Sequence, residues 1–136
     1  MVTEKKTVLV VDDEPDIRKL VSKMLCNKYT VLEAPNGQTA IDMAMQDKPD
    51  LVLMDIMMPG VDGLTACFHI KQHDTGGNIR VVMLTAVNYE LNKKLSTSVM
   101  KADGYITKPF DQKTLISYLD QILSQKDANP PLVENP

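Results

Sequence analysis

Three absences narrow the class of protein that this 136-residue sequence encodes. No apolar run approaches the roughly 18 residues of a membrane-spanning helix, and the first residues, MVTEKKT, hold no apolar core of a signal peptide. No block of Lys and Arg is present and the formal net charge is -3, so nucleic acid and anionic membrane surfaces are not expected partners. We therefore expect a cytoplasmic protein with no direct contact to nucleic acid or membrane.

Motifs for disulfides, zinc and nucleotides are also missing. Cys26 and Cys67 lack a CxxC spacing and fall in predicted helices, so we interpret them as reduced core thiols. No Gly-rich phosphate loop and no GxxxxGKS/T motif is present, which leaves nothing to hold a nucleotide. His69 and His73 have the spacing of a helical metal-binding pair. No acidic or Cys ligand completes that set, and we interpret them as a solvated pair.

The sequence does contain enough apolar residues, 43%, to build the core of one domain. We assign that domain to residues 5–124. Residues 125–136 are polar, include three prolines and show no periodicity, so we expect a flexible tail or a linker stub there.

Short apolar runs alternate with segments of helical period. Buried strands are predicted at Thr7–Val11, Leu51–Met54 and Val81–Leu84, and shorter ones in KYTVLEA and GYIT. Apolar spacing predicts helices around Ile17–Leu25 and Leu115–Leu123, and weaker ones at Gly37–Gln46 and Gly63–His73. The repeated strand-helix order predicts an α/β fold, with a parallel sheet that carries helices on both faces.

Polar residues stand where four of these strands end. Asp12 and Asp13 follow the first strand, Asp55 the third, Thr85 the fourth and Lys108 the fifth. Because ligands bind beyond the carboxyl ends of parallel strands, we expect these side chains to converge on one rim. Each residue alone has an ordinary interpretation, such as an Asp that caps a helix. Their joint placement favours a functional site.

Three carboxylates in one cleft need a proton or a cation. Like charges about 4 Å apart repel by about 4 kcal/mol at an effective dielectric near 20. Mg²⁺ prefers hard oxygen ligands and often binds phosphate oxygens as well, so the residues indicate a Mg²⁺ site with phosphate chemistry. Asp55 is the best candidate for a nucleophile that becomes an aspartyl phosphate, and Lys108 and Thr85 could bind the new phosphoryl oxygens.

Four segments together resemble the receiver domain of response regulators in two-component signal transduction. They are VLVVDDEPDIR, PDLVLMDIMMPGVDG, VVMLTA and ADGYITKPF. The resemblance covers Lys5–Ser124 and implies a flavodoxin-like (βα)5 fold with strand order 2-1-3-4-5. It also implies that Asp55 accepts a phosphoryl group from a sensor histidine kinase or a phosphotransfer protein.

The resemblance assigns a role to each remaining site residue. Asp13 and the Met57 backbone carbonyl would bind Mg²⁺ directly together with Asp55, and Asp12 would act mainly through water. Lys108 would pair with the phosphoryl group and precede a cis peptide bond to Pro109. Thr85 and Tyr105 would be the switch residues, and Tyr105 would move between outward and inward rotamers.

An output surface is also implied, formed by the fourth helix, fifth strand and fifth helix. It would contact an output protein or domain, or a second receiver in a phosphorylation-dependent dimer. The apolar stripe of the fourth helix, Leu91, Leu95 and Val99, is thin, so we predict that this helix is the least stable. Lys101 stands where the family usually has glycine.

Met57 and Val87 lie at positions that tend to tune the lifetime of the phosphoryl group in this family. Both are apolar and cannot orient an attacking water, so we predict slow self-dephosphorylation. Besides this and its own phosphorylation, we expect the domain to catalyse no other reaction.

Two other interpretations compete with this signalling function. The first is a Mg²⁺-dependent aspartyl-phosphate phosphatase that resembles the haloacid dehalogenase family. Such enzymes carry a second Asp two residues after the nucleophile, where this sequence has Met57, and no segment is available for a cap. The second is a binding module that keeps the fold without the chemistry.

Overall fold

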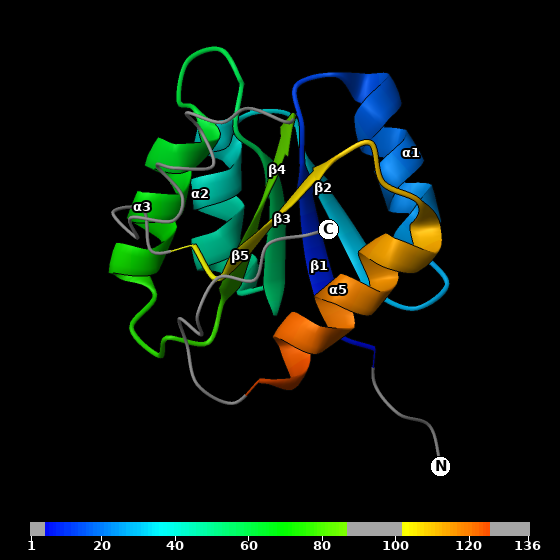
Figure 1. Ribbon diagram of the computed structural model, residues 1–136. Helices are drawn as coiled ribbons and strands as arrows, with labels where there is room; N and C mark the ends of the chain where they lie inside the picture. The colour runs from blue at the N-terminus through cyan, green and yellow to red at the C-terminus, as the bar shows by residue number, and fades with distance from the viewer. Residues whose placement is uncertain (1–4, 87–101, 126–136) are drawn as a thin grey trace.

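The computed structural model describes residues 5–86 and 102–125 of the chain (Figure 1). Its five strands form one parallel sheet in the order β2-β1-β3-β4-β5. The strands are β1 (Thr7–Val11), β2 (Thr30–Ala34), β3 (Leu51–Asp55), β4 (Arg80–Ala86) and β5 (Gly104–Lys108). The helices are α1 (Pro15–Leu25), α2 (Gly37–Asp47), α3 (Gly63–His73) and α5 (Gln112–Ser124). The predicted strand order is therefore confirmed.

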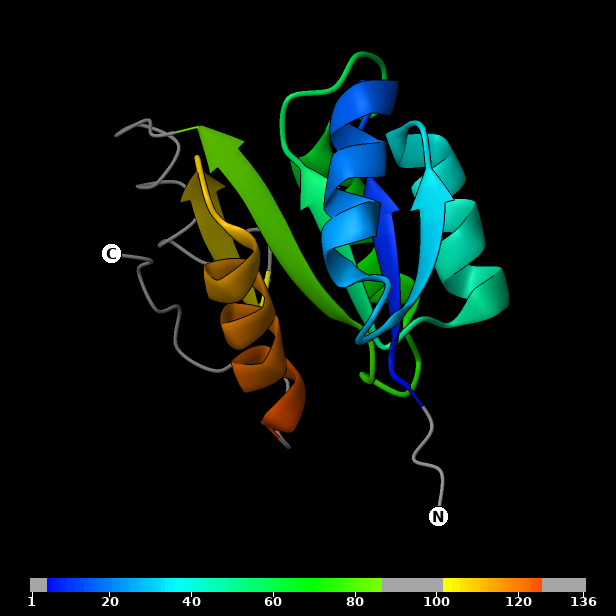
Figure 2. The same cartoon turned by 90° about the vertical axis from the view of Figure 1, so that its right-hand side faces the viewer.

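Helices cover both faces of the sheet. Figures 1 and 2 show α1 and α5 on one face and α2 and α3 on the other. Successive residues of a strand point to opposite faces, so Val8 and Val10 pack in the core under α1 and α5 while Leu9 and Val11 pack in the core under α2 and α3. This explains why the central strands read as continuous apolar runs. All five residues of β3 are buried.

Helix caps explain several local boundaries. Asn36 accepts a hydrogen bond from the Thr39 backbone N–H at 2.8 Å at the start of α2, and Asp62 accepts one from Thr65 at 2.7 Å at the start of α3. Helix α1 differs, because it begins at Pro15 and the residue before it, Glu14, makes no side-chain cap. Asp12 and Asp13 are therefore not at the cap position of α1, and the interpretation of these two residues as helix caps is wrong.

Some sequence predictions about side chains are wrong. Cys67 is buried as expected, but Cys26 is exposed, because it stands at the C-cap of α1 after the last buried turn. Leu20 and Phe68 fit the helical apolar patterns but are 51% and 44% exposed. The buried stripe of α1 and of α3 is narrower than the apolar pattern suggests. In α1, for example, Val21 lies in this stripe and Leu20 does not. His73 is exposed and His69 is partly exposed, which agrees with a solvated pair.

Two further points concern the extent of the description. The predicted fourth helix and its end at Lys101, like Val87, fall in residues 87–101, outside the described residues. Among the residues that are described, no helix has the length and apolar character needed to cross a membrane.

Candidate functional site

Three acidic side chains meet at the carboxyl edge of the sheet. Asp12 and Asp13 directly follow β1, and Asp55 ends the neighbouring strand β3. Each can place a carboxylate oxygen within 4.8 Å of the other two. The parallel pairing of β1 and β3 brings these residues together from positions more than forty apart in the chain. The predicted convergence of the three carboxylates is confirmed.

Asp12 has an acceptor atom that no described group satisfies. The residue is 2% exposed, and its Oδ1 accepts a hydrogen bond from the Glu14 backbone N–H at 2.9 Å. Its Oδ2 is buried and has no hydrogen-bond partner. A buried carboxylate oxygen without a partner is costly, and a cation at the centre of the cluster would compensate it.

Asp55 is close both to the other two carboxylates of the cluster and to a lysine. Its Oδ1 accepts from the Met57 backbone N–H at 3.3 Å, and its Oδ2 is 3.6 Å from Lys108 Nζ. Burial raises the pKa of the Asp55 carboxyl, the charge of Lys108 opposes that rise, and the charge of Asp12 adds to it; the net effect is a raised pKa. Met57, two residues later, is 74% exposed, whereas Asp55 itself is 8% exposed.

The other predicted residues lie on β4 and β5. Thr85 is 1% exposed, and its hydroxyl donates to the Ala86 carbonyl at 2.9 Å. The register pairs Ala86 with Lys108, so β4 and β5 end level, and it pairs Asp55 with Leu84, so β3 ends one residue before Thr85. Lys108 ends β5, and its peptide bond to Pro109 is cis.

Tyr105 lies further from the edge than the other predicted residues. It is 3% exposed on β5 and packs in the core under α2 and α3. The structure therefore places Tyr105 in an inward position.

Two residues that support the site were not singled out from the sequence. A Cβ on Gly63 would lie 2.3 Å from the Asp55 backbone oxygen, and the Gly63 N–H donates to the Ile56 carbonyl at 2.9 Å. Arg18 Nη1 donates to the Asp12 backbone carbonyl at 2.8 Å, and Arg18 Nε donates to Glu33 at 3.1 Å. The only sequence signal for Gly63 is its place at the start of a helix after a turn, which many glycines share.

The donor set fits a hard divalent cation. It offers three carboxylates, one of which has an unsatisfied buried oxygen, and carboxylate oxygens are ligands that Mg²⁺ favours. Among the described residues, this is the one group of at least three acidic, His or Cys side chains close enough to hold a metal ion. Asp12, Asp13 and Asp55 are thus the residues that could bind Mg²⁺.

Comparison with known proteins identifies the family to which this chain belongs. The family model of the response regulator receiver domain matches residues 8–120. The chain belongs to this family. Receiver domains generally bind Mg²⁺, and the acidic cluster is where this receiver could hold it.

Relatives of several kinds share the domain. The phosphate regulon transcriptional regulatory protein PhoB of Pseudomonas aeruginosa is 40% identical over 119 residues, which are 87% of this chain and 52% of that protein. The chemotaxis protein CheY of Halobacterium salinarum is 38% identical over 120 residues, which are 88% of this chain and 98% of that protein. The chain therefore spans about half of the first relative and nearly all of the second.

Solved structures show the same fold. The chemotaxis response regulator CheY4 of Vibrio cholerae matches with a TM-score of 0.78 and 28% identity, over 87% of this chain and 98% of that one. The signal receiver domain of a signal transduction histidine kinase from Syntrophus aciditrophicus matches with a TM-score of 0.77 and 26% identity, over 88% and 90%. This protein is therefore a receiver domain of the two-component type, and the phosphatase alternative is not favoured.

Proposed function

We propose that this receiver accepts a phosphoryl group on Asp55 in a Mg²⁺-dependent reaction and passes the signal to a partner. The observation that supports this most directly is the position of the Asp55 carboxylate. It lies between an acidic cluster with an unsatisfied oxygen on one side and the ammonium group of Lys108 on the other. A nucleophile for phosphoryl transfer needs charge compensation on both its own oxygens and the incoming group.

The donor would be a phosphohistidine on a sensor histidine kinase or a phosphotransfer protein. One carboxylate oxygen of Asp55 forms a bond to phosphorus while the bond from phosphorus to the donor imidazole nitrogen breaks. The electron pair stays with that nitrogen, which then takes up a proton. When bound by Asp13, Asp55 and the Met57 carbonyl, with Asp12 acting through water, Mg²⁺ supplies charge that offsets the developing negative charge on the phosphoryl oxygens.

Lys108 and Thr85 would hold the transferred group. Lys108 is 34% exposed in its side chain and can follow a phosphoryl oxygen, because its four-carbon chain is flexible. Thr85 now donates its hydroxyl to the Ala86 carbonyl, so bonding to a phosphoryl oxygen requires the hydroxyl to turn. The phosphorylated state would then have a hydrogen bond that the unphosphorylated state lacks. Such a difference in contacts is what shifts a conformational equilibrium.

The change at Thr85 would bias the surface formed by helix 4, β5 and α5. Tyr105, buried on β5, is the switch aromatic that would respond to it. That surface would control an output protein or domain, or a second receiver in a phosphorylation-dependent dimer. The receiver would occupy residues 5–124 and residues 125–136 would be a tail or linker. We infer no enzymatic activity beyond its own phosphorylation and slow self-dephosphorylation.

The test is intact mass after incubation with acetyl phosphate. The wild type should gain one phosphoryl group in the presence of Mg²⁺ and none after the metal is removed. Asp55→Asn should gain none. Asp62→Asn is the matched control, because asparagine also caps a helix and the Asp62 side chain accepts from the Thr65 N–H at the start of α3.

Three results would contradict the proposal. An adduct on Asp55→Asn would place the acceptor elsewhere. An adduct formed equally well without Mg²⁺ would remove the role of the acidic cluster. If the folded wild type forms no adduct with acetyl phosphate or with phosphoramidate, the domain has the receiver fold but does not accept a phosphoryl group.

A further inference from the structure

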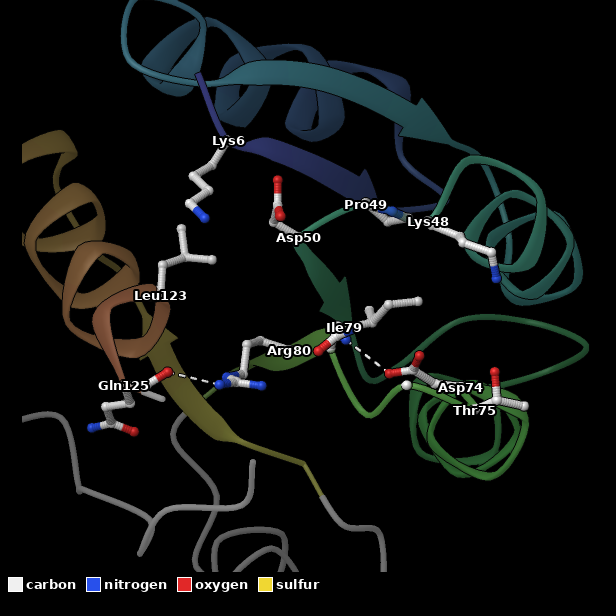
Figure 3. A pocket seen from close by; sticks show the side chains of 12 residues that line it. Lys6, Lys48, Pro49, Asp50, Asp74, Thr75, Ile79, Arg80, Leu123 and Gln125 are labelled. Atoms are coloured by element: carbon white, nitrogen blue, oxygen red, sulfur yellow. Dashed lines mark hydrogen bonds between the residues drawn. The ribbon is translucent and has the colours of Figure 1, made fainter. Parts of the chain in front are cut away.

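A polar cavity lies at the edge of the sheet opposite the acidic cluster, where the strands begin. Its volume is about 630 Å³. Lys6 precedes β1, Asp50 precedes β3, Arg80 starts β4, and Leu123 comes from the last turn of α5 (Figure 3). We call it the basal cavity. Because the strands are parallel, it is separated by their full length from the acidic cluster, and it has no part in the proposed phosphorylation.

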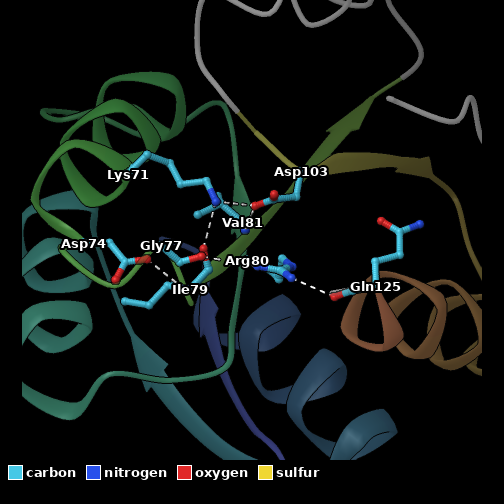
Figure 4. Close-up of polar contacts among 8 residues, drawn as sticks. All are labelled: Lys71, Asp74, Gly77, Ile79, Arg80, Val81, Asp103 and Gln125. Atoms are coloured by element: carbon cyan, nitrogen blue, oxygen red, sulfur yellow. Dashed lines mark hydrogen bonds and ion pairs between the residues drawn. The ribbon is translucent and has the colours of Figure 1, made fainter. Parts of the chain in front are cut away.

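Arg80 is the buried charged residue of the basal cavity. It is 8% exposed, and its guanidinium donates from Nη2 to the Gln125 backbone carbonyl at 2.7 Å and from Nη1 to the Gly77 carbonyl at 3.4 Å (Figure 4). Its Nε is buried and has no hydrogen-bond partner among residues 5–86 and 102–125. Both acceptors are neutral carbonyls, so neither of these two contacts supplies a counter-charge.

A neighbouring buried cation shows how the fold treats such a charge elsewhere. Lys71 Nζ lies 2.6 Å from Asp103 Oδ2, and the same ammonium donates to the Ile79 carbonyl at 2.8 Å (Figure 4). Within the described part of the chain, no carboxylate lies within 4.0 Å of Arg80. A buried charge without a counter-charge is costly, and Arg80 differs from Lys71 because, among the described residues, only backbone carbonyls accept from it.

The carboxylates of the basal cavity are held by backbone groups. Asp50 Oδ2 accepts from the Thr7 N–H at 2.8 Å, and Asp74 Oδ2 accepts from the Ile79 N–H at 2.8 Å. Neither forms an ion pair with Arg80.

The lining also carries two lysines, Lys6 and Lys48. With Arg80 they make three positive groups against two carboxylates. The excess of one positive charge matches a small anion.

A structural role for Arg80 explains only part of this arrangement. Its Nη2 bonds the C-cap residue of α5, where a positive charge complements the carboxyl end of a helix. That contact does not use Nε, and it leaves the cavity beside the guanidinium. The guanidinium fork suits carboxylate and phosphate oxygens, and such charge-assisted bonds are among the strongest in proteins.

We propose that the basal cavity binds a small oxyanion, a carboxylate or a phosphate, with the Arg80 guanidinium as its buried cation and Lys6 as a cation at its rim. The ligand bridges the starts of β1 and β4 and the end of α5. Leu123 and Ile79 supply apolar walls for the part of the ligand that carries no charge.

The test is a ¹H–¹⁵N NMR titration of the full chain without Mg²⁺ at constant ionic strength. Sodium phosphate and sodium succinate are the two probes, and the anion that saturates at the lower concentration identifies the ligand class. The chain contains two arginines, Arg18 and Arg80, so two Nε–H signals are expected. Arg18 Nε is bonded to Glu33 and serves as an internal reference. The Arg80→Lys variant assigns the signals, and Arg18→Lys does so by elimination if Arg80→Lys does not fold.

We expect the Arg80 Nε–H signal to shift with saturation in the millimolar range while the Arg18 signal stays in place. Lys6→Met should weaken binding several-fold, and Lys113→Met, which removes an exposed lysine of α5 outside the cavity, should not. No saturable shift with either anion would overturn the proposal, and so would equal binding by Lys6→Met. Binding seen only after Asp127→Asn and Glu134→Gln would also overturn it, because the chain's own carboxylates would then be the occupant.

Discussion

Asp55 Oδ2 and Lys108 Nζ lie 3.6 Å apart, although a whole strand, β4, separates the strands that carry them. The distance is longer than the roughly 2.7–2.9 Å of a close charge-assisted hydrogen bond. Lys108 therefore reaches across the edge of the sheet toward Asp55 without closing on it. This position allows Lys108 to support the ionised carboxylate now and a phosphoryl oxygen after transfer.

Replacing Lys108 should change the titration of Asp55. Because the charge of Lys108 lowers the pKa of Asp55 against the effect of burial, Lys108→Met should raise that pKa further. It should also slow phosphorylation by acetyl phosphate. A ¹³C NMR titration of the Asp55 carboxyl measures the shift, and Lys113→Met is the control. An unchanged or lower pKa in Lys108→Met would show that the contact is not electrostatically significant.

The exposed Met57 side chain should influence the lifetime of the aspartyl phosphate. A thioether cannot orient an attacking water, so the wild type should lose its phosphoryl group over minutes or longer. Met57→Asn places an amide two residues after Asp55 and should shorten the lifetime. Loss of the added mass with time measures both rates. A wild-type half-life of seconds, or no acceleration in Met57→Asn, would contradict this account.

Gly63 should tolerate no side chain. A Cβ there would lie 2.3 Å from the Asp55 backbone oxygen and 2.8 Å from Ile56 Cα, and these atoms belong to the main chain. Gly63→Ala should destabilise the fold by roughly 1–3 kcal/mol and slow phosphorylation by displacing Asp55. Urea unfolding measures the first effect. In the control Gly76→Ala the new Cβ meets only the Asn78 amide group, which can move, so a similar loss there would refute the explanation.

The buried ion pair of Lys71 and Asp103 should be important for stability. Lys71→Met removes the ammonium group that pairs with the fully buried Asp103 carboxylate and should cost about 3–5 kcal/mol in urea unfolding. Asp103 Oδ2 also accepts from the Val81 N–H at 2.7 Å. Asp103→Asn in the Lys71→Met background keeps an acceptor without the charge and should recover part of the loss. Equal stability of the single and double variants would mean that charge is not the cause.

Asp120 on α5 should make stability depend on acid pH. Burial raises the pKa of Asp120, but hydrogen bonds from Lys28 and Tyr29 and the charge of Lys28 outweigh it, so the pKa lies below the ordinary 3.8. A lowered pKa stabilises the fold above pH 3.8, and this contribution is lost as the pH falls through the folded-state value.

The corresponding measurement is the unfolding free energy from pH 7 down to the acid limit. Asp120→Asn should lose part of the acid dependence of the wild type, and the two curves should approach each other at low pH. Asp42→Asn, which changes a carboxylate whose side-chain contact is with Gln38, is the control and should keep the wild-type dependence. Parallel curves for the wild type and Asp120→Asn would contradict the lowered pKa.

The sequence by itself determined the fold class and the acidic cluster. Apolar runs without alternation identified the strands buried on both faces, and the position of Asp12, Asp13 and Asp55 after such strands placed them at one edge. Both inferences depend on local spacing and on a rule that holds for all parallel sheets. The family resemblance then assigned roles to the residues, and the family model confirms the membership.

The tertiary structure decided which atoms lack partners and which positions are exposed. No local pattern shows that Asp12 Oδ2 has no donor among the described residues, that a Cβ on Gly63 would clash with the Asp55 carbonyl, or that Leu20 is exposed. The burial of the Arg80 charge at the basal cavity is likewise not visible in any local pattern of the sequence. Periodicity is a property of neighbours in the chain, whereas these contacts join segments that become neighbours only when helices pack against the sheet. Their geometry therefore follows from packing, which a single sequence does not reveal.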